Sequence, residues 1–151
     1  KYALEGRLFE RAEPLFAGQL HFNKAFIPFG ADRIGLIQAV SQVANEVLIG
    51  DLIFIFGLPY PVRGLKNFKR LARILLPIAG YLPINMLLPP GARETTHQPK
   101  YTPYWQDADL IAGDMHYIQK YSPTDLGGKT IITNTTTADN MEMLRRRGVY
   151  A

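Results

Sequence analysis

The side chains best suited to chemistry in this sequence are Asp114 and His116, which follow an apolar run that ends at Gly113. A carboxylate beside an imidazole can take a proton from a substrate and return it later in the reaction. We therefore predict that Asp114 and His116 are the catalytic residues. The alternative is a turn-forming aspartate next to a surface histidine, because any two polar loop residues can fall two positions apart.

Four consecutive polar residues, Asn134, Thr135, Thr136 and Thr137, precede a stretch with helical spacing. The N–H groups at a helix N-terminus favour anions such as phosphate or carboxylate. Hydroxyl and amide side chains add further donors there, so we predict that these four residues bind a ligand. The structural alternative is that threonine simply suits a strand and that Thr137 caps the helix.

Two glycine-containing loops supply three more predicted ligand-binding residues: Gly57, Arg63 and Gly113. Arg63 precedes a helical stretch and can pair with an anionic group. Neither GxGxxG nor GxxxxGK[ST] occurs in the chain, so the usual dinucleotide and triphosphate patterns are missing. The spacing of the histidines suits no metal ion, and we predict no metal site.

The composition is that of one globular domain without cysteine chemistry. The 151 residues are 47% hydrophobic and 20% charged, which is enough for a single core. With no cysteine, disulfides, thiolate catalysis and Cys-based zinc sites are excluded, and we expect a cytoplasmic location. Because the chain starts without Met and residues 149–151 look like the start of a strand, we expect a fragment of a longer protein.

The net charge of +4 allows anionic partners without requiring them. No nucleic-acid-binding motif accompanies the basic residues, so we expect no nucleic-acid partner. An anionic small molecule is the partner that the polar loops favour. Eight of the 17 basic residues lie in two clusters, namely Arg63, Lys66, Lys69, Arg70 and Arg73, then Arg145, Arg146 and Arg147.

Hydrophobic periodicity predicts the elements before the polar loops. Residues 20–26 alternate as in a strand, which Pro28 ends or places at a sheet edge. Residues 30–48 have helical spacing, with Asp32 near the start, where a carboxylate suits the helix dipole. Residues 51–57 form a continuous apolar run, which is typical of a strand covered on both faces. A second helix, with one basic face, is expected from residue 65 onward.

The chain is organised around residues 107–148, which we expect to form a strand, a turn, a second strand and a helix. Thr137 can cap this helix, Asp139 and Glu142 lie near its start, and Gly148 follows its arginine-rich end. Alternating strands and helices predict an α/β sandwich with a mostly parallel sheet and helices on both faces. Ligands bind at the C-terminal ends of such strands, where the predicted site residues fall.

Residues 74–92 carry no charge but contain several prolines. A proline inside a helix costs ~3 kcal/mol, so a straight membrane-spanning helix is not expected. We expect a buried broken segment, a lid or a homodimer contact, with contact with an anionic membrane surface as the alternative. We take residues 77–106 as a proline-rich irregular insertion, in which Tyr101, Tyr104 and Trp105 either stack on a ligand or cap the core.

One part of the chain carries a family resemblance. Residues 108–149, ADLIAGDMHYIQKYSPTDLGGKTIITNTTTADNMEMLRRRGV, resemble poorly characterised prokaryotic proteins labelled quinate or shikimate 5-dehydrogenase-like. The stretch GDLIFIFGLPYPVRGL is a fainter match. The resemblance implies a Rossmann-like fold, and an oxidoreductase that uses NAD or NADP in the complete protein.

Two functional hypotheses follow from the sequence. In the first, the chain is a Rossmann-like domain of a dehydrogenase-like protein and binds an anionic small molecule or cofactor at the C-terminal strand ends. In the alternative, it is a non-catalytic regulatory or oligomerisation module that uses residues 74–92 for self-association or for peripheral membrane contact.

Overall fold

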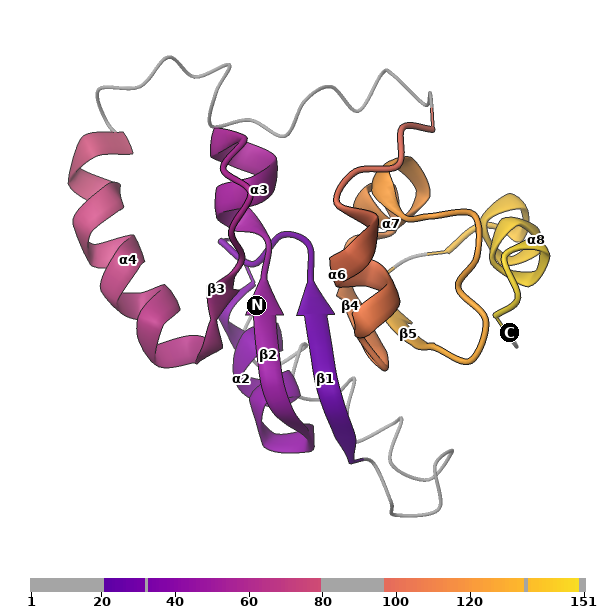
Figure 1. Ribbon diagram of the computed structural model, residues 1–151, viewed down its shortest axis with the longest axis horizontal. Helices are drawn as coiled ribbons and strands as arrows, with labels where there is room; N and C mark the ends of the chain where they lie inside the picture. The colour runs from indigo at the N-terminus through magenta and orange to yellow at the C-terminus, as the bar shows by residue number, and fades with distance from the viewer. Residues whose placement is uncertain (1–20, 32, 80–96, 135, 150–151) are drawn as a thin grey trace.

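A computed structural model describes residues 21–31, 33–79, 97–134 and 136–149, and its centre is a five-stranded sheet of order β3-β2-β1-β4-β5 (Figure 1). The β1, β2, β4 and β5 strands are parallel, and β3 is antiparallel to β2. The prediction of a mostly parallel α/β sheet is therefore confirmed. The strands are β1 (Phe22–Ile27), β2 (Ala44–Ile49), β3 (Val62–Arg63), β4 (Leu110–Gly113) and β5 (Thr130–Thr133).

Helices cover both faces of the sheet, also as predicted. The side chains of β1 alternate: Ala25 and Ile27 lie in one buried cluster, and Phe26 lies in the other. The first cluster is closed by α2 (Ile34–Val43) and α4 (Gly64–Ala79). Figure 1 shows α7 and α8 on the side opposite α4. The second cluster is closed by α6 (Thr102–Asp107), α7 (Met115–Tyr121) and α8 (Ala138–Arg146).

Two elements were predicted wrongly in the first half of the chain. The helix expected over residues 30–48 ends at Val43, and the next residues form strand β2. The strand expected over residues 51–57 is instead the short helix α3 (Asp51–Phe56). Gly57 ends α3 in the left-handed conformation, with φ of 68°, while Asp51 lies at its positive N-terminal end. These capping signals outweigh the apolar run, which alone does not distinguish a strand from a buried helix.

Residues 107–148 contain one helix more than predicted. Helix α7 lies between β4 and β5, where a turn was expected, so His116 belongs to a helix and not to a loop. Helix α6 likewise forms at the end of the stretch expected to be irregular. Residues 80–96, which carry most of that predicted insertion and of the uncharged segment, lie outside the described residues.

The remaining element predictions agree with the fold. Pro28 follows the last residue of β1, although β1 is central in the sheet and not at its edge. The predicted helix after residue 136 is α8, which Thr137 caps together with Asn140 in a capping box. No helix among the described residues is long and apolar enough to cross a membrane. Asp32 and residues 1–20, 150 and 151 lie outside the described residues.

Candidate functional site

Three polar side chains meet at the C-terminal edge of the sheet. The Arg33 guanidinium, from the loop after β1, lies 2.9 Å from an Asp114 carboxylate oxygen at the end of β4. The Asn134 side chain, at the end of β5, donates to the same oxygen over 3.0 Å. Chain segments far apart in the sequence are thus joined where α/β proteins place their ligands.

The geometry gives Asp114 several partners. Its other carboxylate oxygen accepts the His116 backbone N–H over 2.9 Å and so caps α7. The Asn134 side-chain oxygen accepts the Met115 backbone N–H over 3.1 Å. His116 is exposed, and in the described part of the chain no hydrogen bond joins its ring to the Asp114 carboxylate. The two predicted catalytic residues are therefore neighbours, with Asp114 occupied as a cap and as an ion-pair partner.

A buried carboxylate fills the turn that follows β1. Asp51, which is 5% exposed, accepts the backbone N–H groups of Gly30 and Ala31, each over 2.8 Å. A Cβ atom on Gly30 would lie 2.7 Å from the Ile37 side chain, so a larger residue in this turn would have to displace that buried side chain. Backbone amides at this position bind phosphate in many dinucleotide-binding domains. Here the protein's own carboxylate takes those two amides.

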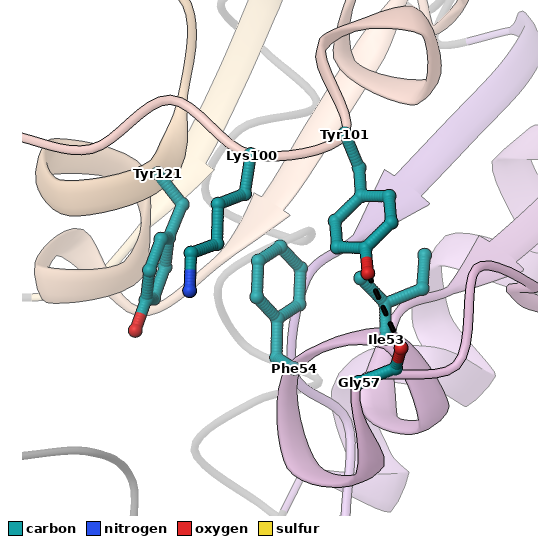
Figure 2. A pocket seen from close by; sticks show the side chains of 6 residues that line it. All are labelled: Ile53, Phe54, Gly57, Lys100, Tyr101 and Tyr121. Carbon is teal, nitrogen blue, oxygen red and sulfur yellow. Dashed lines mark hydrogen bonds between the residues drawn. The ribbon is translucent and has the colours of Figure 1, made fainter.

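An open cleft of about 400 Å³ lies between α3, α7 and the segment before α6 (Figure 2). Figure 1 places α3 and α7 beyond the arrowheads of β1 and β2, so the cleft is on the C-terminal side of the sheet. Its lining combines aromatic rings with one ammonium group. The lining residues are Ile53, Phe54, Gly57, Lys100, Tyr101 and Tyr121.

The α7 wall of this cleft is held by hydrogen bonds to the last carbonyls of the helix. The backbone N–H groups of Gln98 and Lys100 donate to the carbonyls of Lys120 and Tyr121, over 2.7 and 3.1 Å. The Arg147 guanidinium donates to the Ile118 and Gln119 carbonyls and to the buried Ser122 hydroxyl. Because these bonds satisfy the last carbonyls of α7, Tyr121 and Lys100 are fixed side by side.

The predicted ligand-binding residues do not form one group. Gly57 lines the cleft, whereas Gly113 is buried and pairs with Thr133 in the sheet. Asn134 lies with Asp114, as described above. Arg63 is 78% exposed and forms an ion pair with Glu46 on β2, away from the polar cluster.

Of the three predicted threonines, the structure gives a capping role to one. Thr137 caps α8, because its hydroxyl accepts the Asn140 backbone N–H. Thr136 is exposed, and among the described residues its hydroxyl makes no hydrogen bond. Thr135 lies outside the described residues. The structural alternative for this stretch therefore fits Thr137.

Sequence reasoning missed Arg33 and the residues of the cleft apart from Gly57 and Tyr101. Arg33 stands where a strand ends and a helix begins, which was a usable signal once β1 was recognised. Lys100 and Tyr121 had no such signal, because they are brought together only by tertiary contacts. In the aromatic stretch before β4, Trp105 is fully buried, as the core alternative predicted, and Tyr101 lines the cleft, where stacking on a ligand stays a prediction.

A family model described as a domain of unknown function (DUF8754) matches residues 1–151. The chain belongs to this family. No curated protein and no solved structure matches it. Within the described part of this DUF8754 chain, no group of three or more His, Asp or Glu side chains could hold a metal ion.

Proposed function

We propose that this chain is a Rossmann-like domain that binds an anionic small molecule or cofactor at the C-terminal edge of its sheet. The observation that carries the proposal is the cleft that holds the Lys100 ammonium among the Phe54, Tyr101 and Tyr121 rings. Its volume of about 400 Å³ falls in the range of small-molecule pockets, ~300–1,000 Å³.

The topology of the sheet supports this location. From the central strand β1, the chain continues to β2 on one side and later returns to β4 on the other. Connections that leave in opposite directions open a crevice at the strand ends, which is where such folds bind ligands. Helix α3 follows β2 and α7 follows β4, so the cleft between them belongs to this crevice.

The Asp51 carboxylate restricts where the anionic group of a ligand can bind. Because it takes the Gly30 and Ala31 amides, a ligand phosphate has no place in the turn after β1. The anionic group of a ligand therefore goes to the Lys100 side of the crevice. The dehydrogenase resemblance makes NAD, NADP, quinate and shikimate the first ligands to try, and Asp114 the first residue to try for proton transfer.

A thermal-shift and calorimetric screen with these four compounds tests the proposal. Ligand at about 100 times its dissociation constant stabilises the folded state by ~2.7 kcal/mol. Lys100→Gln should weaken binding, whereas the same change at Lys69, on the exposed face of α4, should leave it unaltered. The proposal is overturned if none of the four compounds, nor any anion in a wider metabolite panel, raises the melting temperature.

The alternative proposal is an oligomerisation or regulatory module. It is favoured by large apolar side chains at the surface: Leu58 at 48% exposure, Tyr60 at 70% and Ile74 at 59%. Sedimentation velocity should then show a homodimer that Ile74→Glu dissociates, and pelleting with anionic liposomes tests membrane contact. A monomer at all concentrations that ignores the liposomes would leave this alternative without support.

A further inference from the structure

We infer that the cleft takes a flat aromatic ring that carries an anionic group. This inference rests on the proposed function, since it names the class of ligand for the same site. The ring lies against the aromatic wall, and the anionic group faces the Lys100 ammonium. The class covers aromatic carboxylates and nucleoside phosphates, whereas saturated, polyhydroxylated acids fall outside it.

The walls of the cleft present three aromatic rings, and one of the hydrogen-bonding groups on them, the Tyr101 hydroxyl, already has the Gly57 carbonyl as its partner. The Phe54 and Tyr121 ring centroids are 4.9 Å apart, with an interplanar angle of 35°, and Tyr101 meets Phe54 edge-on at 6.3 Å. Ile53 adds an aliphatic surface. A flat ring gains stacking and edge contacts here. A sugar-like ring would bury several hydroxyls beside carbon atoms, and each one left without a partner weakens binding.

The positive charge of Lys100 lies next to the aromatic rings of the cleft. The Lys100 ammonium is 5.5 Å from the Tyr121 ring centroid, and Figure 2 shows it directed into the cleft. None of the six lining residues carries a carboxylate that would neutralise it. An anion bound to Lys100 is therefore held within about one ring width of the Tyr121 face, which sets the spacing between the two parts of the ligand.

The backbone of Tyr101, next to Lys100, has a conformation that is rare for a residue other than glycine. Tyr101, with φ of 56°, is the only residue other than glycine with positive φ among those the structure describes. Non-glycine residues in this region carry backbone strain, which is common where a protein holds a ligand. The Tyr101 hydroxyl reaches the Gly57 carbonyl across the cleft over 3.4 Å, a long bond that a ligand can readily replace.

Binding of matched probes, measured by calorimetry, tests the inference. Benzoate and AMP represent the two sources of the class, cyclohexanecarboxylate is the saturated anion, and benzyl alcohol is the neutral ring. We expect benzoate, AMP or both to bind about tenfold more tightly than cyclohexanecarboxylate and benzyl alcohol. Lys100→Gln should cost the aromatic anions about tenfold and leave benzyl alcohol unchanged, and Lys100→Arg should restore most of the loss.

A second set of variants tests the contact between the ligand ring and Phe54. Phe54→Leu should reduce the preference for benzoate over cyclohexanecarboxylate, whereas Phe22→Leu, the same change at a half-buried ring at the start of β1 and outside the cleft, should keep the preference. Phe54 is half-buried, so its leucine variant tests the contact without emptying the core. Circular dichroism of each variant separates lost binding from lost folding.

The aromatic ligand class and the proposed function would be overturned by different results. Equal binding of cyclohexanecarboxylate and benzoate, or binding of quinate alone, overturns the aromatic class and leaves anion binding in the cleft intact. Failure of every probe, including the dinucleotides, overturns the proposed function itself.

Discussion

Asp114 is the residue on which the C-terminal edge of the sheet depends. It caps α7 with one oxygen and receives Arg33 and Asn134 with the other. Asp114→Ala should lower the free energy of unfolding by about 2–4 kcal/mol, because the cap and the ion pair are lost together. Asp114→Asn should cost only about 1–2 kcal/mol, because asparagine is an equally good cap but carries no charge for Arg33.

Urea denaturation measures both changes, with Asp139→Asn in the exposed first turn of α8 as the control, expected to cost less than about 1 kcal/mol. A double-mutant cycle with Arg33→Gln isolates the ion pair. Equal losses for Asp114→Ala and Asp114→Asn would show that the cap contributes nothing.

Lys24 makes the stability of the folded state depend on pH in the alkaline range. Its hydrogen bond to the Asp107 carboxylate raises the pKa of Lys24 above 10.5, and the charges of Asp107 and Glu46 act in the same direction, while desolvation opposes them. The folded state therefore binds the Lys24 proton more tightly than the unfolded state. Its contribution is complete below pH 10.5 and disappears as the pH rises through the folded-state pKa.

The stability difference between wild type and Lys24→Met should accordingly be constant from neutral pH up to about pH 10 and shrink above it. Denaturation at a series of pH values measures this, with Lys66→Met on the exposed face of α4 as the control. A difference that grows with alkaline pH has the wrong sign for this mechanism.

Individual site residues were predictable only where the sequence marks them locally. Asp114 and Asn134 follow recognisable apolar runs, and they do meet at the predicted edge. Lys100 is separated from Phe54 by a long stretch of chain, and nothing local marks it as part of a site. Arg63 was predicted because it precedes a helix, but an edge strand carries it to Glu46 instead.

At the level of elements, the end of α7 depends on one arginine of a cluster of three. Arg147 donates to the Ile118 and Gln119 carbonyls, and burial lowers its pKa, whereas Arg145 and Arg146 are exposed. Arg147→Lys should cost about 1–3 kcal/mol, because a single ammonium cannot reach the same acceptors as the planar guanidinium. Arg145→Lys should change stability by less than about 0.5 kcal/mol.

Urea denaturation measures these costs, and hydrogen exchange in α7 shows where they arise. Faster exchange of the α7 amides in Arg147→Lys alone would agree with a role for Arg147 in holding the helix end. Because lysine keeps the positive charge, the absence of a loss in both variants would mean that the charge alone holds the helix end, and equal losses in both would mean that the Arg147 contacts have no special role.

Helix boundaries were predictable where capping residues mark them. Thr137 and Gly148 delimit α8 correctly, because a cap is a local interaction. The α2–β2 junction was not predictable, because Ala44, Val47 and Leu48 fit a helical stripe as well as a strand. Only pairing with β1 decides their conformation.

The whole molecule depends on β1 as its central strand. Ala25, Phe26 and Ile27 are fully buried, and β1 pairs with β2 on one side and with β4 on the other. We expect the amides of β1 and β4 to exchange most slowly with solvent, and those of the two-residue edge strand β3 much faster. Hydrogen exchange by mass spectrometry measures the order, and early exchange of β1 would contradict it.

The fold class could be predicted from the sequence, but the strand order could not. Alternating apolar and helical segments already required an α/β sandwich. Which strands become neighbours depends on contacts such as Ala25 with Leu110, between residues far apart in the chain. The cleft is lined by residues of α3, α7 and the segment before α6, which are also far apart in the chain, so the cleft could not be predicted either.

The direct passage from α2 into β2 determines which insertions this chain can accept. Val43 ends the helix and Ala44 begins the strand, so no loop residue can absorb a change in length. One alanine inserted between them moves β2 by one position against β1 and turns Val47 and Ile49 to the opposite face. One glycine inserted in the exposed turn at Gly128 should leave the urea midpoint almost unchanged, while the first insertion abolishes cooperative unfolding. Relatives of different length should therefore differ at such turns and keep the junction after Val43 free of insertions.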